Sequence, residues 1–424
     1  MDSAVIRDAG RNYRKTNALT KDIAERSAEL SSKGYQAWVK ARQESDFALF
    51  APMLEQWVDL LKEKCHLIDA SRPVYDVCLD DYERGLTAPR LDKVFSEVKE
   101  GLLPLLHDIR ERGTAPDKSW LAGEYDVKLQ AQMCEEIAKD LGFSTERGRL
   151  DVSVHPFTGG AHPNDVRMTT RFDPACLTEG LTGAVHETGH ALYEQGRNLE
   201  YDGLPVNEAL SMGIHESQSL LWERMVCLQP AFSKYLLPRM RSLFPDDIPA
   251  SATAQQLYEA LNVVRTPSLI RVESDEVTYP MHIILRYEIE RALMEGRVEI
   301  KDLPEVWNEK MQSYLGCTPQ TAAEGVLQDV HWSVGAIGYF PTYSLGAMYA
   351  CQIYEAANKE LALDEQIAQG SFGSLKEWLN AKVHTTGSLY PSGDLLMEQV
   401  TGAPLNPSIF LKYLNDKYRP LYKL

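Results

Sequence analysis

The stretch Ala184–Gln195 contains two histidines four residues apart, with a glutamate directly after the first: His186-Glu187-Thr188-Gly189-His190. This H-E-x-x-H spacing is typical of helical zinc hydrolases. It constrains the local fold, because on a helix residues i and i+4 stand one above the other on the same face. Both imidazoles can then reach one metal ion, and the glutamate lies beside it. The sequence therefore predicts a metal-binding helix over 184–195.

The residues that flank the two histidines support an amphipathic helix. At about 100° per residue, five apolar side chains fall on the side opposite His186, namely Leu181, Ala184, Val185, Ala191 and Leu192. Gly183 and the polar residues occupy the other side. Gly183 precedes His186 by about one turn, so we expect it to leave room for an ion. The alternative is that the motif arose by chance.

Charge and cysteine usage narrow the class of protein. The 424 residues include 61 acidic and 44 basic side chains, with a formal net charge of −17. This charge repels phosphate backbones and anionic lipid heads, so we expect no nucleic acid and no membrane among the partners. The first 21 residues lack the apolar core of a secretion signal. Seven scattered cysteines without a C-x-x-C pair predict small buried residues in a reducing compartment. We therefore expect a cytoplasmic protein.

Most of the chain shows the three- and four-residue periodicity of helices. Helices are predicted within 20–66 and at about 90–112 and 122–141, whereas 76–84 is predicted to be a turn with a carboxylate cluster. The first of these stretches carries six expected core residues, namely Phe47, Phe50, Leu54, Trp57, Leu60 and Leu61. No repeat or linker divides the sequence. We therefore expect one mainly helical domain over 1–424.

The hydrophobic period changes to two in Leu150–Phe157 and in Asp165–Phe172, with a glycine-containing segment between them. This pattern predicts a β-hairpin immediately before the metal helix, which Asp173-Pro174 would begin. A strand edge beside such a helix can hold an extended peptide by main-chain hydrogen bonds. The hairpin is therefore a candidate ledge for a substrate.

A catalytic zinc site needs a third protein ligand and one open position. A second helix, capped by Asn207 and running to about Cys227, contains Glu216. Gly213 lies about one turn before Glu216, as Gly183 does before His186. Glu216 is therefore the leading candidate for the third ligand. Spacing alone leaves open that it is an ordinary solvated side chain.

Five motifs resemble, in their order along the chain, those of the Taq-type zinc carboxypeptidases. They are the D-x-R-x-T-like Asp165–Thr169, the His186–His190 box, His215-Glu216-Ser217 with Gln218, the I-R-x-x-A-D-like Ile270–Asp275 and the G-x-x-Q-D-x-H-W-like Gly325–Trp332. The resemblance runs from about Gly34 to the C-terminus. One departure is Ser274, which replaces the usual alanine of the fourth motif and is equally small.

The resemblance implies a mainly α fold: a large two-lobed helical metallopeptidase domain with a deep groove closed at one end, and a small β-hairpin or sheet beside the zinc helix. It implies zinc held by His186, His190 and Glu216, with Glu187 as general base, and a homodimer. Cobalt or manganese could replace zinc. His155-Pro156-Phe157 resembles a segment that helps to close the groove. Family members usually carry another helical segment before the point where this chain starts, so that segment is expected to be missing.

Two residues of the glycine-rich stretch 325–346 are candidates for stabilising the negative charge that develops during peptide hydrolysis. His331 and Tyr343 can donate hydrogen bonds to such an oxyanion. Either one can instead be a core residue whose polar atom is satisfied within the fold.

The two motif arginines, Arg167 and Arg271, are candidates for binding the terminal carboxylate of a peptide, since a guanidinium contacts a carboxylate in a bidentate manner. The alternative is structural ion pairing, with Asp165 for the first and with Glu273 or Asp275 for the second.

Other polar residues are expected to support the metal ligands or to play no chemical role. His215, Asp165 and Gln328-Asp329 would fit as groups that orient the imidazoles and Glu216, and plain packing hydrogen bonds are the alternative. Four further histidines have no second ligand at a useful spacing, namely His66, His107, His282 and His384.

The sequence therefore predicts a zinc-dependent carboxypeptidase that hydrolyses the C-terminal bond of peptides. Two alternatives remain open: a zinc oligopeptidase that cuts internally, and an inactive zinc-stabilised binding protein. Intact Glu187 argues against the last, because a purely structural zinc site needs no base.

Overall fold

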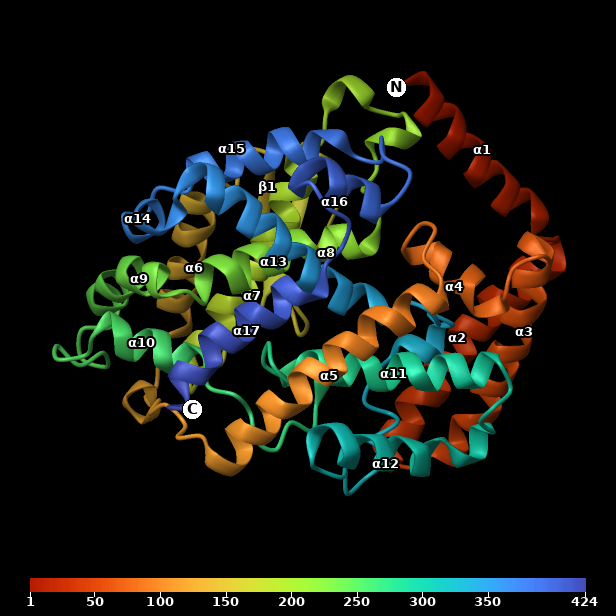
Figure 1. The fold of residues 1–424 in the computed structure, drawn as a ribbon, viewed down its shortest axis with the longest axis horizontal. Coiled ribbons are helices and arrows are strands. Elements are labelled where there is room, and N and C mark those ends of the chain that lie inside the picture. The colour runs from red at the N-terminus through yellow and green to blue at the C-terminus, as the bar shows by residue number, and fades with distance from the viewer. The chain divides into compact units, whose positions relative to one another are not determined.

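The computed structural model describes residues 1–424 and contains 17 α-helices and one three-stranded sheet (Figure 1). The chain forms two compact units: Met1–Glu111 with Val264–Ser344, here the first unit, and Arg112–Val263 with Leu345–Leu424, the second unit. The predicted mainly helical fold is confirmed. The assignment of 1–424 to a single domain stays a prediction. None of the helices combines the length and the apolar character that a membrane span requires.

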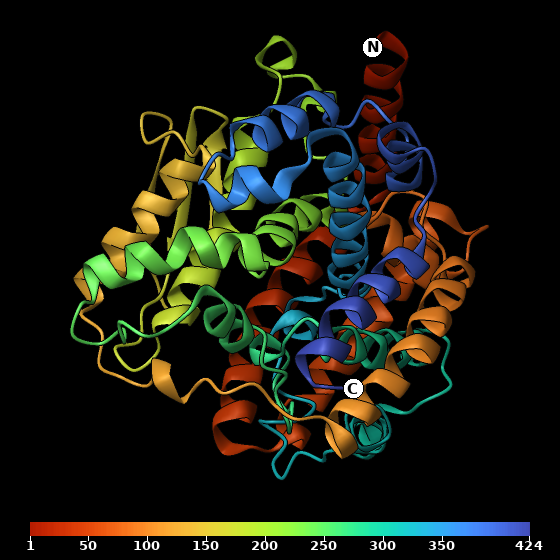
Figure 2. The same cartoon turned by 60° about the vertical axis from the view of Figure 1, so that its left-hand side comes forward.

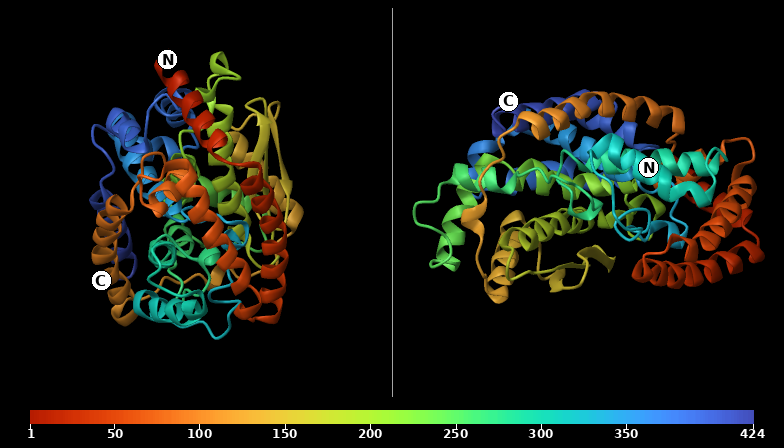
Figure 3. Two further views of the ribbon diagram at one scale, coloured as in Figure 1. Left: turned by 90° about the vertical axis from the view of Figure 1, so that its right-hand side faces the viewer. Right: turned by 90° about the horizontal axis from the view of Figure 1, so that it is seen from below.

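The first unit is built from helices. They are α1 (Asp2–Ala18), α2 (Lys21–Glu44), α3 (Ala51–Asp69), α4 (Val74–Tyr82), α5 (Ala88–Arg112), α11 (Tyr279–Met294) and α12 (Leu303–Leu315). Helices α2 and α3 lie side by side (Figure 3). The six core residues predicted within 20–66 lie in α3 and just before it, and all are buried. That prediction is confirmed.

The turn predicted at 76–84 is wrong, because most of this stretch forms helix α4. Basic side chains compensate the clustered carboxylates: Asp80 forms ion pairs with Arg11 and Lys15 of α1, and Asp81 with Lys15. Ion pairs with these basic side chains offset the repulsion between the neighbouring carboxylates of α4.

The second unit holds the sheet and the remaining helices. They are α6 (Val127–Leu141), β1 (Gly148–Val152), β2 (Phe157–His162), β3 (Asp165–Thr170), α7 (Leu177–Gln195), α8 (Met212–Leu220), α9 (Pro230–Leu243), α10 (Ala254–Leu261), α13 (Pro341–Leu361), α14 (Leu363–Ala368), α15 (Gly373–Lys382), α16 (Gly393–Thr401) and α17 (Pro407–Leu421). Helix α6 and strands β2 and β3 pack against α7 (Figure 2). A small sheet thus lies beside the helix that carries the H-E-x-x-H motif, as predicted.

The strand pairing differs from the predicted hairpin. The central strand β3 pairs antiparallel with β2 and parallel with β1. Strand β2 begins at Phe157, the last residue of the first predicted strand, and its other residues, Thr158–His162, belong to the segment predicted to connect the two strands. Gly160 explains the error, because a Cβ atom there would lie 2.1 Å from the carbonyl oxygen of Asp165. A glycine in a strand often marks a bulge or a close approach of two backbones rather than a turn.

The N-terminal caps of α7 and α8, the two helices that carry the metal motifs, also differ from the predicted ones. Cys176, not Asp173, precedes the first residue of α7, and the Asp173 side chain instead accepts a hydrogen bond from the backbone N–H of Ala175. Ser211, not Asn207, caps α8 by accepting from the N–H of Ile214. Both errors are shifts of three or four residues along a segment with several good capping residues, which local chemistry alone does not distinguish.

Candidate metal centre

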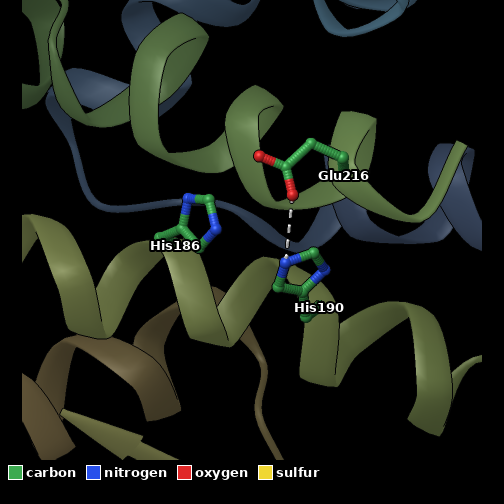
Figure 4. Close-up of side chains that lie close together, drawn as sticks. All are labelled: His186, His190 and Glu216. Carbon is green, nitrogen blue, oxygen red and sulfur yellow. Dashed lines mark ion pairs between the residues drawn. The ribbon is translucent and has the colours of Figure 1, made fainter. Parts of the chain in front are cut away.

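Helices α7 and α8 bring His186, His190 and Glu216 together, as Figure 4 shows. One nitrogen or oxygen atom from each side chain lies within 4.8 Å of the other two. Within the cluster, His190 Nε2 and Glu216 Oε2 form an ion pair at 3.6 Å. Two imidazoles and one carboxylate are a donor set that suits zinc and similar divalent ions. The residues present therefore fit a divalent metal.

Two glycines allow the backbones around this cluster to approach. A Cβ atom on Gly189 would lie 2.5 Å from the carbonyl oxygen of Gln218, so a side chain there would push α8 away from α7. A Cβ atom on Gly346 would lie 2.6 Å from Cγ of Glu216. Gly183 was expected to leave room for an ion. In the structure it allows close packing against Thr170, because a Cβ atom at Gly183 would lie 3.3 Å from Oγ1 of Thr170.

Each histidine of the cluster is held through its Nδ1 atom. His186 Nδ1 lies 2.7 Å from Oε2 of Glu223. His190 Nδ1 lies 2.6 Å from Nδ1 of His215, whose Nε2 lies 2.9 Å from Oε1 of Glu194. Such contacts set the tautomer and orientation of a metal-binding imidazole and leave its Nε2 atom for the ion. His215 thus occupies the orienting position suggested for it.

Glu223 was missed in the sequence. It lies in Leu221–Cys227, a π-helical segment that continues α8, and such wide turns frequently occur at functional sites. A signal was present, because Glu223 follows Glu216 by two helical turns and the two carboxylates therefore lie on nearly the same face. The sequence contains no sign of which imidazole this second carboxylate would reach.

The electrostatics of the cluster favour a cation. Burial lowers the pKa of His186, but the hydrogen bond to Glu223 and the charges of Glu216, Glu223 and Glu187 outweigh burial and raise it to about 9. Burial raises the pKa of Glu216, but the His190 hydrogen bond and the two imidazoles lower it to about 2. A site that holds a proton so firmly on His186 is rich in negative charge. A divalent cation can replace that proton.

We expect Glu223→Gln to weaken metal binding about 10–100-fold, the usual cost of removing an outer hydrogen-bond partner of a ligand. The amide keeps the size of the side chain but loses the charge that favours the Nδ1–H tautomer of His186. Competition between the protein and a chromophoric zinc chelator measures this affinity. Glu208→Gln, at an exposed position, makes the same charge change and should leave the affinity unaltered. Equal affinities for the two variants would contradict the role of Glu223.

Glu187 is also held in place by a residue that the sequence did not indicate. Its side chain is buried, and its Oε2 atom accepts a hydrogen bond of 2.6 Å from the hydroxyl of Thr158 on β2. The same hydroxyl lies 3.0 Å from the Glu187 carbonyl oxygen. The Oε1 atom is left for other partners. Thr158 was assigned to a loop, so its contact with Glu187 was not foreseeable.

The first unit contains a separate buried cluster around Arg271. The guanidinium contacts Asp329 through Nε and Nη2 and donates from Nη1 to the hydroxyl of Tyr279. Arg286 binds the other oxygen of Asp329 at 2.6 Å. The alternative that Arg271 pairs with Glu273 or Asp275 is therefore wrong, because its ion-pair partner is Asp329. Two arginines share one carboxylate, which leaves the cluster with a net positive charge.

Gln328 and Asp329 form hydrogen bonds with the arginine cluster of the first unit. Gln328 Oε1 accepts from the backbone N–H of Arg271 and from Arg286, so this motif supports the arginine cluster instead. Asp165 forms a bidentate pair with the exposed Arg167, at 2.9 Å for each bond, and this is the structural alternative considered for Arg167. His384, assigned no role, contacts Oε1 of the motif residue Gln218.

His331 and Tyr343 contact each other, with 3.1 Å between Nε2 and the hydroxyl oxygen. Burial lowers the pKa of His331 to about 4, so the ring is neutral near pH 7. Glu290 of α11 anchors the segment that carries both residues: it accepts hydrogen bonds from Trp332 Nε1 and from the Gly338 N–H, each at 2.9 Å. The sequence did not single out Glu290.

The titration of Glu290 should appear in the stability of the protein. Burial raises its pKa to about 7, against an ordinary value near 4.5. Between these values the unfolded chain loses the proton and the folded chain keeps it, so the free energy of unfolding falls as pH rises, by an amount on the order of 3 kcal/mol. Below about pH 4.5 and above about pH 7 the contribution is constant.

Urea denaturation at pH 5, 6 and 8 tests this expectation in the wild type and in Glu290→Gln, whose amide does not titrate. The difference in unfolding free energy, wild type minus variant, should decrease from pH 5 to pH 8. Parallel pH profiles would contradict the raised pKa.

The mainly helical fold and the cluster of two histidines and one glutamate are those of an H-E-x-x-H metallopeptidase. The model of the carboxypeptidase Taq (M32) metallopeptidase family matches residues 2–418. The match thus starts further toward the N-terminus than Gly34, where the resemblance in the sequence began. The chain belongs to this family, and it is a metallocarboxypeptidase.

Individual relatives agree with this assignment. Thermostable carboxypeptidase 1 of Thermus thermophilus is 40% identical over 432 aligned positions, which cover 99% of this chain and 84% of that protein. Carboxypeptidase 1 of Bacillus subtilis is 40% identical, with 93% of this chain and 78% of that protein covered. The crystal structure of the M32 carboxypeptidase from Deinococcus radiodurans R1 matches with a TM-score of 0.96 at 33% identity, over 100% of this chain and 85% of that one.

Proposed function

We propose that the protein uses zinc, held by His186, His190 and Glu216, to remove single residues from the C-terminus of peptides. The observation that carries this proposal is the convergence of these three side chains from α7 and α8 within 4.8 Å. A zinc ion in this position would lower the pKa of a water molecule from about 15.7 toward 7 and polarise the scissile carbonyl group. Cobalt or manganese fits the same donors less specifically.

In this proposal Glu187 is the general base. Thr158 occupies its Oε2 atom, so Oε1 is the oxygen that takes the proton from the attacking water. Proton transfer by a positioned carboxylate contributes about 10²–10⁴-fold to a rate. The protonated Glu187 then delivers the proton to the leaving amine. The buried position of Glu187 keeps bulk water from competing for this proton.

We also propose that His331 and Tyr343 donate hydrogen bonds to the oxyanion. Because His331 is neutral near pH 7, it carries one ring N–H that can donate without bringing a full charge. The 3.1 Å contact between the two side chains keeps them adjacent before a substrate binds, and it opens when both donors turn toward the oxyanion. Glu290 fixes the segment that presents them. Hydrogen-bond donors lower the activation barrier most when they are already held in position before the oxyanion forms.

Arg271 is the proposed ligand of the substrate's terminal carboxylate. Its bonds to Asp329 and Tyr279 use three of the five N–H donors of the guanidinium, which leaves two. Asp329 compensates only one of the two arginines that it binds, so an incoming carboxylate would meet a net positive charge. Arg167 is the weaker candidate, because Asp165 already occupies it in a bidentate manner.

We expect Arg271→Lys to lower kcat/KM for peptides about 10–100-fold, mainly through KM, because it removes a charge-assisted bond worth roughly 1.5–3 kcal/mol. Steady-state kinetics on a peptide and on its C-terminal amide measure the effect. The wild type should favour the acid, and the variant should discriminate little. Arg167→Lys is the matched control and should keep the preference. Loss of the preference in Arg167→Lys alone would reassign the role.

One experiment tests the activity itself. The purified protein is loaded with zinc and incubated with peptides that differ at the C-terminus, with and without a chelator, and the products are identified by mass spectrometry. Release of single C-terminal residues, abolished by the chelator, supports the proposal. Internal fragments would identify an oligopeptidase. A zinc-loaded protein that cleaves none of the peptides would identify a binding protein.

Two wider proposals remain: the family resemblance supports a homodimer, and the scattered cysteines support action in the cytoplasm. Light scattering coupled to size-exclusion chromatography measures the first, with a dimer expected near twice the 47.8 kDa of the chain. Fractionation of cells that express the untagged protein measures the second.

A further inference from the structure

Two of the seven cysteines lie together in the interior of the first unit. Cys65 of α3 and Cys78 of α4 are both buried, and their Sγ atoms are 3.4 Å apart. Disulfide bonds have an S–S distance near 2.05 Å, so an approach of about 1.4 Å would join them. Four other cysteines contact oxygen atoms through their sulfur, namely Cys134, Cys176, Cys317 and Cys351.

The two thiols are chemically unequal. The hydrogen bond with Cys78 is the main influence on Cys65 and lowers its pKa, with a smaller contribution from Lys64 and Lys15, although burial and the charge of Asp81 act in the opposite direction. The same hydrogen bond and burial raise the pKa of Cys78. A thiolate is the nucleophilic form of cysteine. Cys65 is therefore the sulfur that reacts first, and Cys78 is positioned to attack it afterwards.

We propose that Cys65 and Cys78 are a redox-active pair that forms a reversible intramolecular disulfide when the protein meets hydrogen peroxide. The Cys65 thiolate attacks one peroxide oxygen, the O–O bond breaks, and a hydroxide leaves and becomes water, which makes Cys65 a sulfenic acid. The Cys78 sulfur then attacks the Cys65 sulfur, the S–O bond breaks, and the second hydroxide leaves as water with the Cys78 proton. The two thiols lose two electrons and two protons in total, and the peroxide becomes two waters.

This disulfide would tie α3 to α4 at a place where α4 supports other parts of the first unit. Tyr75 of α4 donates a hydrogen bond to Glu290 at 3.0 Å. The backbone of Cys78 lies against Gly338, where a Cβ atom would be 2.9 Å from the Cys78 carbonyl carbon. Oxidation would therefore change the packing of α4 next to the segment that carries His331. Formation of the disulfide does not itself require His331.

Peptide mapping of the full-length protein tests the proposal. The folded protein is treated with a modest excess of hydrogen peroxide, free thiols are alkylated, and the chain is digested with trypsin. Trypsin should release both cysteines in one peptide, residues 65–84, because Lys64 precedes it and Pro73 protects Arg72 from cleavage. We expect this peptide to escape alkylation and to lose about 2 Da, the mass of two hydrogens. Dithiothreitol should restore both thiols.

Controls separate this pair from general oxidation. Cys134→Ser removes a buried cysteine of the second unit and should leave the mass loss intact, whereas Cys65→Ser should abolish it. If Cys65→Ser does not fold, the wild-type map alone decides. Alkylation of both cysteines at a peroxide dose that already oxidises the half-buried Cys176 or Cys317 would overturn the proposal. A sulfinic acid on Cys65 in place of the disulfide would also overturn it.

Discussion

Replacing Glu187 with glutamine is expected to lower kcat about 10²–10⁴-fold while the metal stays bound. The amide has nearly the size of the carboxylate and can keep a contact with Thr158, but it cannot accept a proton from water near pH 7. Glu187 is not one of the three clustered ligand residues, so the affinity for zinc should change little. Release of the C-terminal residue measures kcat, and atomic emission of the dialysed protein measures bound zinc.

Glu179→Gln provides the matched control for this variant. Glu179 lies in the first turn of the same helix and pairs with Arg171 at the surface, so its replacement makes the same chemical change away from the cluster. It should retain wild-type turnover. A Glu187→Gln enzyme that retains both zinc and its full rate would remove Glu187 as the base and would leave the proposed mechanism without a proton acceptor.

Replacing Glu216 with glutamine is expected to weaken zinc binding by more than about 100-fold and to abolish activity at low zinc. Removal of a hydrogen-bond partner of a metal ligand typically lowers the metal affinity about 10–100-fold, and removal of a ligand itself should lower it more. Glu216 is also the negatively charged member of the cluster, with a pKa lowered to about 2, so it is ionised at every working pH. Glutamine retains the shape and loses the charge.

Thermal unfolding with and without a chelator tests whether Glu216→Gln still binds zinc. A bound ion stabilises the folded state by an amount that grows with its concentration relative to Kd. The wild type should therefore lose Tm when the chelator is added, whereas Glu216→Gln should unfold at one temperature in both conditions. A variant that still responds to the chelator as strongly as the wild type would show that Glu216 is not a ligand.

The sequence was sufficient to predict those features that depend on neighbours along the chain. The four-residue spacing of His186 and His190 places both on one helical face in any fold that keeps the helix, and the periodicity within 20–66 identified the buried face of α3. The family resemblance rested on motifs in a fixed order, and the match over residues 2–418 confirmed it.

Only the tertiary structure decided which distant residues meet. Glu223 reaches His186, Thr158 reaches Glu187, and Arg271 binds Asp329 rather than its sequence neighbours. The pairing of β3 with both β1 and β2 was likewise invisible in the local pattern. Hydrogen bonds and ion pairs act over about 3 Å in space, and residues 29 to 58 positions apart satisfy that condition only after the helices and the sheet have packed.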